Sequence, residues 1–150
     1  MLQQGEVWFL IVDGRQARVL AEVRRGAELR ELSDWTMSLS DEDALEAQDR
    51  PPRTFDRVGP GRHAVGDDRD LRQEEEDRFA KRVVERLEAA SQAGAFAHLV
   101  VAAPPRALGV FRGLLSSALQ AKLRADIAKD LLKEDAAALK PRLEAALRAA

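Results

Sequence analysis

The sequence predicts an α/β fold in which a five-stranded mixed sheet lies between layers of helices. Two continuous apolar runs, Val7–Val12 and residues 98–103, are typical of central strands buried on both faces. Stretches with apolar residues at helical spacing lie between and after them. A chain of 150 residues that is 45% hydrophobic and 33% charged can bury one core without cross-links. We therefore expect residues 1–150 to form a single three-layer domain.

The N-terminal part of the chain favours an antiparallel meander. The first run ends at Asp13-Gly14, which is a turn signal. Residues 17–23 alternate in part and predict a second strand, and residues 28–35 predict a third. The short connections place these three strands side by side and antiparallel.

Residues 37–70 predict a long loop because no period of 2 or 3.6 holds across them. A loop of this length in a compact domain is usually functional or disordered. It contains the helix- and strand-breaking residues Pro51, Pro52, Gly59, Pro60, Gly61 and Gly66.

A long helix is predicted to begin near Asp70, with Gln73 as its capping-box partner. The acidic run 74–77 would then lie in the first turn, where the helix dipole favours negative charge. Gly94 is expected to end the helix as the residue after its C-cap. The predicted buried stripe comprises Phe79, Ala80, Val83, Val84, Leu87 and Ala90.

The C-terminal part adds two helices and one strand. Pro104-Pro105 should stop the strand at 98–103 and start a helix that buries Leu108, Phe111, Leu115, Ala118 and Leu119. Alternation of Ile127, Lys129 and Leu131 favours a short fifth strand, the alternative being a continued helix. Leu139, Leu143 and Leu147 mark a terminal helix, with Pro141 in its first turn or at a kink. The order is β-β-β-loop-α-β-α-β-α, and helical crossovers make the later strands parallel to a neighbour.

Composition excludes several classes of chemistry. The chain has no cysteine, so disulfides, thiolate metal sites and cysteine nucleophiles are excluded. A net charge of −2 exerts no strong overall pull on nucleic acid. No secretory signal and no span of about 20 apolar residues is visible, so we expect a cytoplasmic protein. No cofactor and no metal are predicted, and no set of residues identifies a reaction.

The loop at residues 50–66 is the predicted binding surface. Arginines grip phosphates in bidentate fashion, an aromatic ring stacks on a base, and glycine allows close approach of the backbone. The alternative is a solvated linker whose arginines pair with acidic residues on either side, among them Asp49 and Asp67. The candidate binding residues are Arg53, Phe55, Arg57, Gly59, Gly61, Arg62 and His63.

Two further positions carry weaker hypotheses. Arg106 lies between a strand end and a helix N-terminus, where anions are favoured, and the alternative is a solvated arginine at a plain helix start. Asp13 could ligate Mg²⁺ with Asp70 or Asp130, but an Asp-Gly turn explains it more simply. His98 starts a strand and is interpreted as structural.

Several stretches, in this order and spacing, resemble those of the bacterial host attachment family, over about residues 6–147. The resemblance implies a role in attachment to host cells. It also implies a layout similar to the central domain of class-1 archaeal and eukaryotic translation release factors, with ribonuclease H-like topology. The stretches are Asp13-Gly14-Arg15-Gln16-Ala17-Arg18, Arg53-Thr54-Phe55-Asp56, Gly61-Arg62-His63-Ala64, Glu75-Glu76-Asp77-Arg78-Phe79-Ala80, Ala93-Gly94-Ala95-Phe96 and Ala102-Ala103-Pro104-Pro105-Arg106-Ala107-Leu108-Gly109.

The resemblance leaves two functions open. The first is a cytoplasmic, non-enzymatic interaction protein that acts through residues 50–66, with a host-surface factor as one expected partner. The alternative is an RNA- or ribosome-associated factor with peptidyl-tRNA hydrolase-like activity. Release factors carry a Gly-Gly-Gln tip in this loop, whereas this chain has Gly59-Pro60-Gly61-Arg62-His63, so only the position of the loop carries over. A metal-dependent nuclease using Asp13 is a third hypothesis.

Overall fold

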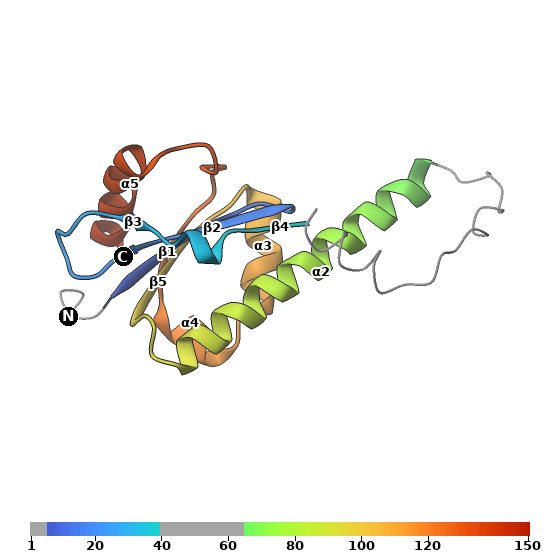
Figure 1. The fold of residues 1–150 in the computed structure, drawn as a ribbon. Coiled ribbons are helices and arrows are strands. Elements are labelled where there is room, and N and C mark those ends of the chain that lie inside the picture. The colour runs from blue at the N-terminus through green and yellow to red at the C-terminus, as the bar shows by residue number, and fades with distance from the viewer. Residues whose placement is uncertain (1–5, 40–64) are drawn as a thin grey trace.

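A computed structural model of the chain describes residues 6–39 and 65–150, with side chains of the second part described from Asp70 onward. Its centre is a mixed six-stranded sheet in the order β3-β2-β1-β5-β6, with β4 pairing to β2 off this path (Figure 1). Helices cover both faces of the sheet, so the predicted mixed α/β architecture in three layers is confirmed.

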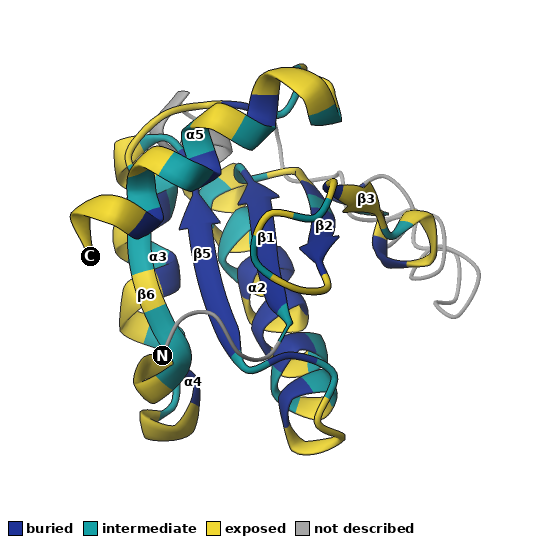
Figure 2. Ribbon diagram, turned by 90° about the vertical axis from the view of Figure 1, so that its left-hand side faces the viewer, coloured by how far each residue is buried: buried dark blue, intermediate teal, exposed yellow. Residues whose placement is uncertain are grey.

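The two apolar runs form the centre of the sheet, as predicted. Strands β1 (Val7–Val12) and β5 (His98–Ala102) are buried at every position. They pair in parallel, with Leu10 opposite Val101, and they stand out as the buried middle of Figure 2. Strand β2 (Gln16–Glu22) runs antiparallel to β1 through the Asp13-Gly14 turn.

The predicted third strand at residues 28–35 is reduced to two residues, and a further short strand lies at residues 37–38, so the predicted start of the long loop at residue 37 is wrong. Strands β3 (Arg30–Glu31) and β4 (Met37–Ser38) both pair with β2, and the 3-10 helix η1 (Ser33–Trp35) separates them. The interruption turns Trp35 into the core, where its ring meets Trp8 edge-on at 5.8 Å. The sheet therefore has six strands where the sequence predicts five.

Helix α2 (Val65–Gln92) begins before the predicted start at Asp70, so the Asp70–Gln73 capping box is wrong. The acidic run 74–77 consequently lies well inside the helix and not in its first turn. The predicted end is confirmed, because Gly94 has a φ of 77° and donates to the Ser91 carbonyl at 3.0 Å. Ala95 donates to the Ala90 carbonyl at 2.9 Å, which completes a Schellman motif.

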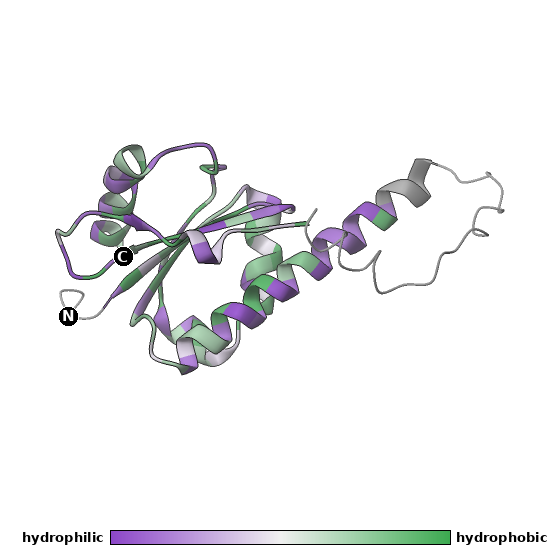
Figure 3. Ribbon diagram, viewed as in Figure 1, coloured by the Kyte–Doolittle hydropathy of each residue, from purple (hydrophilic) through white to green (hydrophobic). Residues whose placement is uncertain are grey.

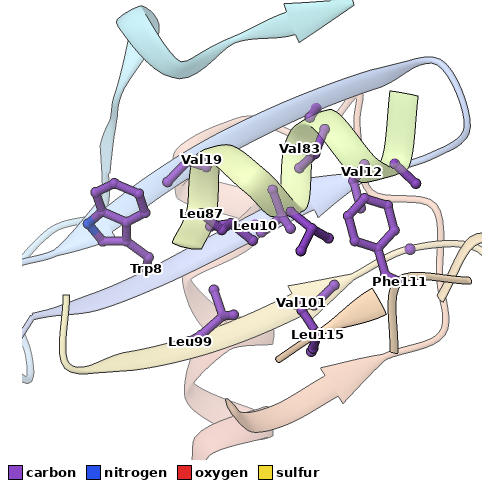
Figure 4. Packing of buried hydrophobic residues seen from close by; sticks show 14 of the residues in the cluster. Trp8, Leu10, Val12, Val19, Val83, Leu87, Leu99, Val101, Phe111 and Leu115 are labelled. Carbon is purple, nitrogen blue, oxygen red and sulfur yellow. The ribbon is translucent and has the colours of Figure 1, made fainter. Parts of the chain in front are cut away.

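The larger core lies between the sheet and helices α2, α3 (Pro105–Leu114) and α4 (Ser117–Lys122). Val83 and Leu87 of α2 and Phe111 of α3 meet the side chains of Leu10 and Val101 there (Figure 4). The predicted stripe of α2 is confirmed, with Ala90 at its partly buried edge.

The smaller core lies on the other face, under α5 (Ala136–Ala149), which buries Leu139, Leu143 and Leu147 as predicted. Asp135 caps this helix by accepting from the Ala138 amide at 2.9 Å. Pro141 lies in the second turn and not in the first.

The fifth predicted strand is displaced along the chain. Strand β6 (Leu123–Ile127) pairs in parallel with β5, so Lys129 lies beyond it and Leu131 is buried in the following loop. The displacement follows from α4, which the sequence did not separate from α3. Ser116 caps α4 by accepting from the Leu119 amide at 3.1 Å, and the new helix leaves Ala118 exposed, against prediction.

A network of charged side chains joins α5 to the sheet. Glu22 is fully buried at the end of β2 and accepts from Arg25 at 2.6 Å and from Lys140 at 3.1 Å. Arg25 also donates to Glu144 at 2.8 Å. This hydrogen bond lowers the pKa of Glu144 and raises that of Arg25. The carboxylate of Glu22 is thus compensated, as a buried charge requires.

Arg18 fixes the loop that leads into α5. Its guanidinium donates to both oxygens of Glu31, at 2.9 and 2.7 Å, and to the carbonyls of Leu132 and Glu134, at 2.7 and 2.8 Å. The hydrogen bonds with Glu31 raise the pKa of Arg18. Arg18 belongs to the first stretch that carries the family resemblance, and its role here is structural.

Candidate functional site

A pocket lined by both charged and apolar side chains opens at the carboxyl ends of the two central strands, β1 and β5. Its cavity of about 170 Å³ lies between the turn after β1, the middle of α2 and the start of α3. This edge of an α/β sheet is where ligands commonly bind. The lining residues are Asp13, Gly14, Gln73, Glu76, Asp77, Ala80, Pro104, Arg106, Ala107, Val110 and Phe111.

The turn after β1 is held by the carboxylate of Asp13. One oxygen accepts from the backbone amides of Arg15 and Gln16, at 2.7 and 2.8 Å. The interpretation of Asp13 as a turn residue is therefore confirmed. Among the described residues, no group of three or more Asp, Glu or His side chains is placed to hold a metal ion, so nothing supports the proposed magnesium site with Asp70 and Asp130.

Gly14 allows the close approach of Glu76. A Cβ atom at position 14 would lie 2.7 Å from the carboxyl carbon of Glu76, so any other residue would push that side chain away. Glu76 is half-buried, and in the described part of the chain it has no hydrogen-bond or ion-pair partner. Asp77 beside it accepts from the Gln73 side-chain amide at 2.9 Å.

Arg106 lies at the pocket as the sequence predicts for a residue between a strand end and a helix N-terminus. Its guanidinium donates to the side-chain oxygen of Gln73 and so links α3 to α2. Three carboxylates, those of Asp13, Glu76 and Asp77, and one guanidinium line the cavity, which gives it a formal charge of −2. Anion binding by Arg106 stays a prediction, and its surroundings are acidic.

The predicted binding residues of the loop lie outside the described residues. They are Arg53, Phe55, Arg57, Gly59, Gly61, Arg62 and His63. The structure does describe where this segment leaves and rejoins the fold. Leu39 donates its backbone amide to the Arg15 carbonyl at 2.8 Å, next to the pocket turn, and the chain resumes at Val65 as the first residue of α2.

The N-terminal end of α2 extends beyond the sheet (Figure 1) and is largely hydrophilic (Figure 3), whereas Gln73, Glu76 and Asp77 further along the helix line the pocket. From Asp70 to Arg78 no side chain is buried, and Leu71 is 58% exposed. Helical structure without a buried face is stabilised by neighbouring polar pairs or by contacts outside the body. In the sequence, the predicted binding residues at 50–66 are thus followed directly by α2, whose N-terminal end extends beyond the sheet.

His98 is confirmed at the start of β5, where it is buried and its Nδ1 accepts from Arg124 at 3.0 Å. Sequence reasoning missed the role of Gln73, Glu76 and Asp77 in the pocket, because a run of acids was interpreted as a solvated first turn. The sequence alone contains no signal that ties Glu76 to Gly14, since the two are brought together only by the packing of α2 on the sheet.

The fold and the pocket together define a mixed-sheet α/β protein with a pocket at the carboxyl ends of its central parallel strands. The chain belongs to the family described as "Protein required for attachment to host cells", whose profile matches residues 8–143. The resemblance inferred from the sequence is therefore confirmed. No curated protein matches the chain.

Solved structures similar to this chain include two archaeal proteins. One is the crystal structure of an archaeal translation termination factor, with 19% identity and a TM-score of 0.49 over 91% of this chain and 34% of that one. The other is described as an archaeal protein, with 20% identity and a TM-score of 0.50 over 97% of this chain and 37% of that one. The chain thus spans about a third of the length of either, and at these identities the second likeness shows the fold alone.

None of the helices in the described part of the chain combines the length and the apolarity needed to cross a membrane.

Proposed function

We propose that this protein is a non-enzymatic interaction protein that binds a protein partner, a host-surface factor being one candidate, through residues 50–66 and the adjoining half of α2. The observation that carries the proposal is the projecting part of α2. It has no buried side chain between Asp70 and Arg78, and it exposes Leu71 at the end of the molecule where residues 50–66 rejoin the fold. An exposed leucine flanked by charged residues suits the apolar centre and polar rim of a protein interface.

Charge supports a protein partner over nucleic acid. Residues 50–66 hold four arginines against one aspartate, a formal charge of +3. Residues 65–78 hold seven acids against three arginines, a formal charge of −4. Two adjacent stretches of opposite sign suit a partner with both kinds of charge, because complementary patches steer association. A polyanion would be attracted by the first stretch and repelled by the second.

A photo-crosslinking amino acid at position 71 tests the proposal, with position 23 as the matched control. Leu71 and Val23 are the large hydrophobic residues exposed in the described chain, and Val23 follows β2 at the opposite end of the sheet from the pocket. We expect a defined partner to be captured from position 71 and not from position 23. Replacing Arg57, Arg62 and His63 by alanine should lower the yield by at least about tenfold, since truncated hot-spot residues dominate binding. Equal yields from both positions would count against this surface.

The alternative is an RNA- or ribosome-associated factor. The more specific version of this alternative adds a peptidyl-tRNA hydrolase-like activity. The formal charge of +3 on residues 50–66 is the observation that favours it. Co-sedimentation with ribosomes at low and high salt separates the two functions, because phosphate contacts weaken steeply as salt rises. Salt-sensitive co-sedimentation that the triple alanine variant abolishes would establish association with the ribosome through these residues. If the protein does not co-sediment with ribosomes at low salt, the alternative function is wrong.

A further inference from the structure

Strand β6 forms one edge of the sheet and has a single neighbour, β5, in the described part of the chain. Its side chains are half-buried or exposed, in contrast to the fully buried β5 (Figure 2). A bulge at Arg124 interrupts the register with β5. Edge strands present unpaired backbone groups, which is the arrangement that strand addition by a peptide uses.

The register identifies a residue whose backbone groups face the open edge. The Ile127 carbonyl accepts from the Ala103 amide at 3.0 Å, so Ile127 directs its hydrogen-bonding groups towards β5. In a parallel strand successive residues alternate in this respect. Asp126 therefore directs its N–H and C=O away from the sheet.

A groove of about 500 Å³ runs beside this edge, between β6 and the C-terminal half of α5. Small side chains of α5, those of Ala145, Ala146 and Ala149, form its apolar wall. Because α5 lies over this face of the sheet, a strand added to β6 would place every second side chain against the alanines.

The charged residues of the groove favour an acidic occupant. Arg142 is paired with Glu134 at 3.1 Å, and Asp126 is paired with Arg112 at 3.1 Å, so these two charges are compensated. Arg124 donates to a histidine nitrogen, which leaves its positive charge uncompensated by that contact. Lys129 is exposed at the end of the groove and has no ion-pair partner among the described residues. Two cations thus face the occupant.

We propose that β6 binds an extended acidic peptide as an additional strand, with the backbone of Asp126 as its hydrogen-bonding partner and Arg124 and Lys129 as its charge contacts. A second copy of this chain is the weaker occupant, because it would bring the same two cations against those of the first. This site is separate from the pocket and from residues 50–66, so its failure would leave the proposed function untouched.

Two fluorescent ten-residue peptides test the proposal, one alternating valine with glutamate and one alternating valine with lysine. They share length and β-propensity and differ in charge. We expect saturable binding of the acidic peptide in fluorescence anisotropy, at least about tenfold tighter than the basic one at low salt. At saturation the amide of Asp126 should exchange with solvent at least about tenfold more slowly, measured by hydrogen exchange with NMR detection.

Two controls separate strand addition from charge attraction alone. An acidic peptide N-methylated at alternate residues keeps its charges but loses backbone donors, and it should not protect Asp126. Lys129→Glu should weaken binding of the acidic peptide about fivefold, whereas Lys133→Glu, also exposed but outside the groove, should leave it nearly unchanged.

Three outcomes would overturn the proposal. They are equal binding of the two peptides, binding of the N-methylated peptide with undiminished affinity, and equal effects of the substitutions at 129 and 133. A dimer in analytical ultracentrifugation whose Asp126 amide is protected without peptide would also overturn it, since the occupant would then be a second copy.

Discussion

The two halves of α2 belong to one continuous helix but are stabilised in different ways. The C-terminal half inserts Phe79, Val83 and Leu87 into the larger core, where none of the three is exposed. The N-terminal half has no fully buried side chain from Asp70 to Arg78, and its half-buried acids Glu76 and Asp77 line the pocket. At 28 residues the helix is about 42 Å long, so its two ends lie in different surroundings.

The difference teaches that the buried apolar contacts of α2 are confined to its C-terminal half in the described part of the helix. Burial of apolar surface stabilises the embedded half. The contacts between Asp70 and Arg78 are polar instead, such as the hydrogen bond from Arg106 to Gln73. Arg86 marks the embedded side, since its guanidinium lies 4.5 Å from the centre of the Trp35 ring and donates to the Asp34 carbonyl at 2.8 Å. Substitutions in α2 from Phe79 onward should therefore lower stability, whereas substitutions before Phe79 should change stability little.

The largest effect is expected from Phe79→Ala, at the first fully buried position among the helix side chains described from Asp70 onward. Loss of a buried phenylalanine leaves a cavity and should lower the free energy of unfolding by about 4 kcal/mol. Urea denaturation followed by circular dichroism measures this value. A loss below about 1 kcal/mol would mean that the embedded half begins further along the chain.

A smaller effect is expected from Gly94→Ala, at the residue that ends the embedded half. Its φ of 77° is strained for any residue with a side chain, although the space around it is open. The free energy of unfolding should fall by about 1 kcal/mol, measured in the same urea titration. Gly109→Ala is the matched control, because Gly109 lies inside α3 with equally open space and no positive φ. That substitution should be neutral or slightly stabilising.

The pH dependence of stability should differ between Glu144, which is paired with Arg25, and Glu76, which has no partner in the described chain. The hydrogen bond from Arg25 lowers the folded-state pKa of Glu144. Its contribution is therefore fully present above about pH 5 and is lost as the pH falls through the folded-state pKa. Glu144→Gln should cost below about 1 kcal/mol at pH 7 and nothing at low pH.

Glu76→Gln is the counterpart in the projecting half. Glu76 lacks a partner in the described chain, so its substitution should leave stability unchanged at both pH values, measured by urea denaturation. A pH-dependent loss of the same size as for Glu144 would show that Glu76 is paired after all.

The smallest effect is expected from Leu71→Ala. With 58% of its surface exposed, the side chain contributes little to folding, and the free energy of unfolding should change by less than about 0.5 kcal/mol. The same substitution should weaken partner capture, measured by affinity pull-down, if this half of the helix is the binding surface. A substantial loss of stability would mean that Leu71, like Phe79, contributes to the stability of the fold.

The parts of the fold that bury apolar side chains could be predicted from the sequence, and the parts that do not could not. Strands β1 and β5 and the stripe from Phe79 to Leu87 follow from continuous or periodic apolar residues. The start of α2 at Val65 leaves no such trace, because a helix that buries no face has no hydrophobic period. The sequence pointed to Asp13 and Arg106 as separate positions, but it did not predict that they share a pocket or that Glu76 lines it.

The aromatic contacts have a practical consequence for spectroscopy. The chain contains two tryptophans and no tyrosine, and both indoles meet in one edge-to-face pair beside Phe96. Nearly all near-ultraviolet absorbance and intrinsic emission therefore originate from a single spot, where η1 lies against the sheet. Tryptophan fluorescence should therefore change when the contact between η1 and the sheet loosens. It should not change when a partner binds at the N-terminal end of α2.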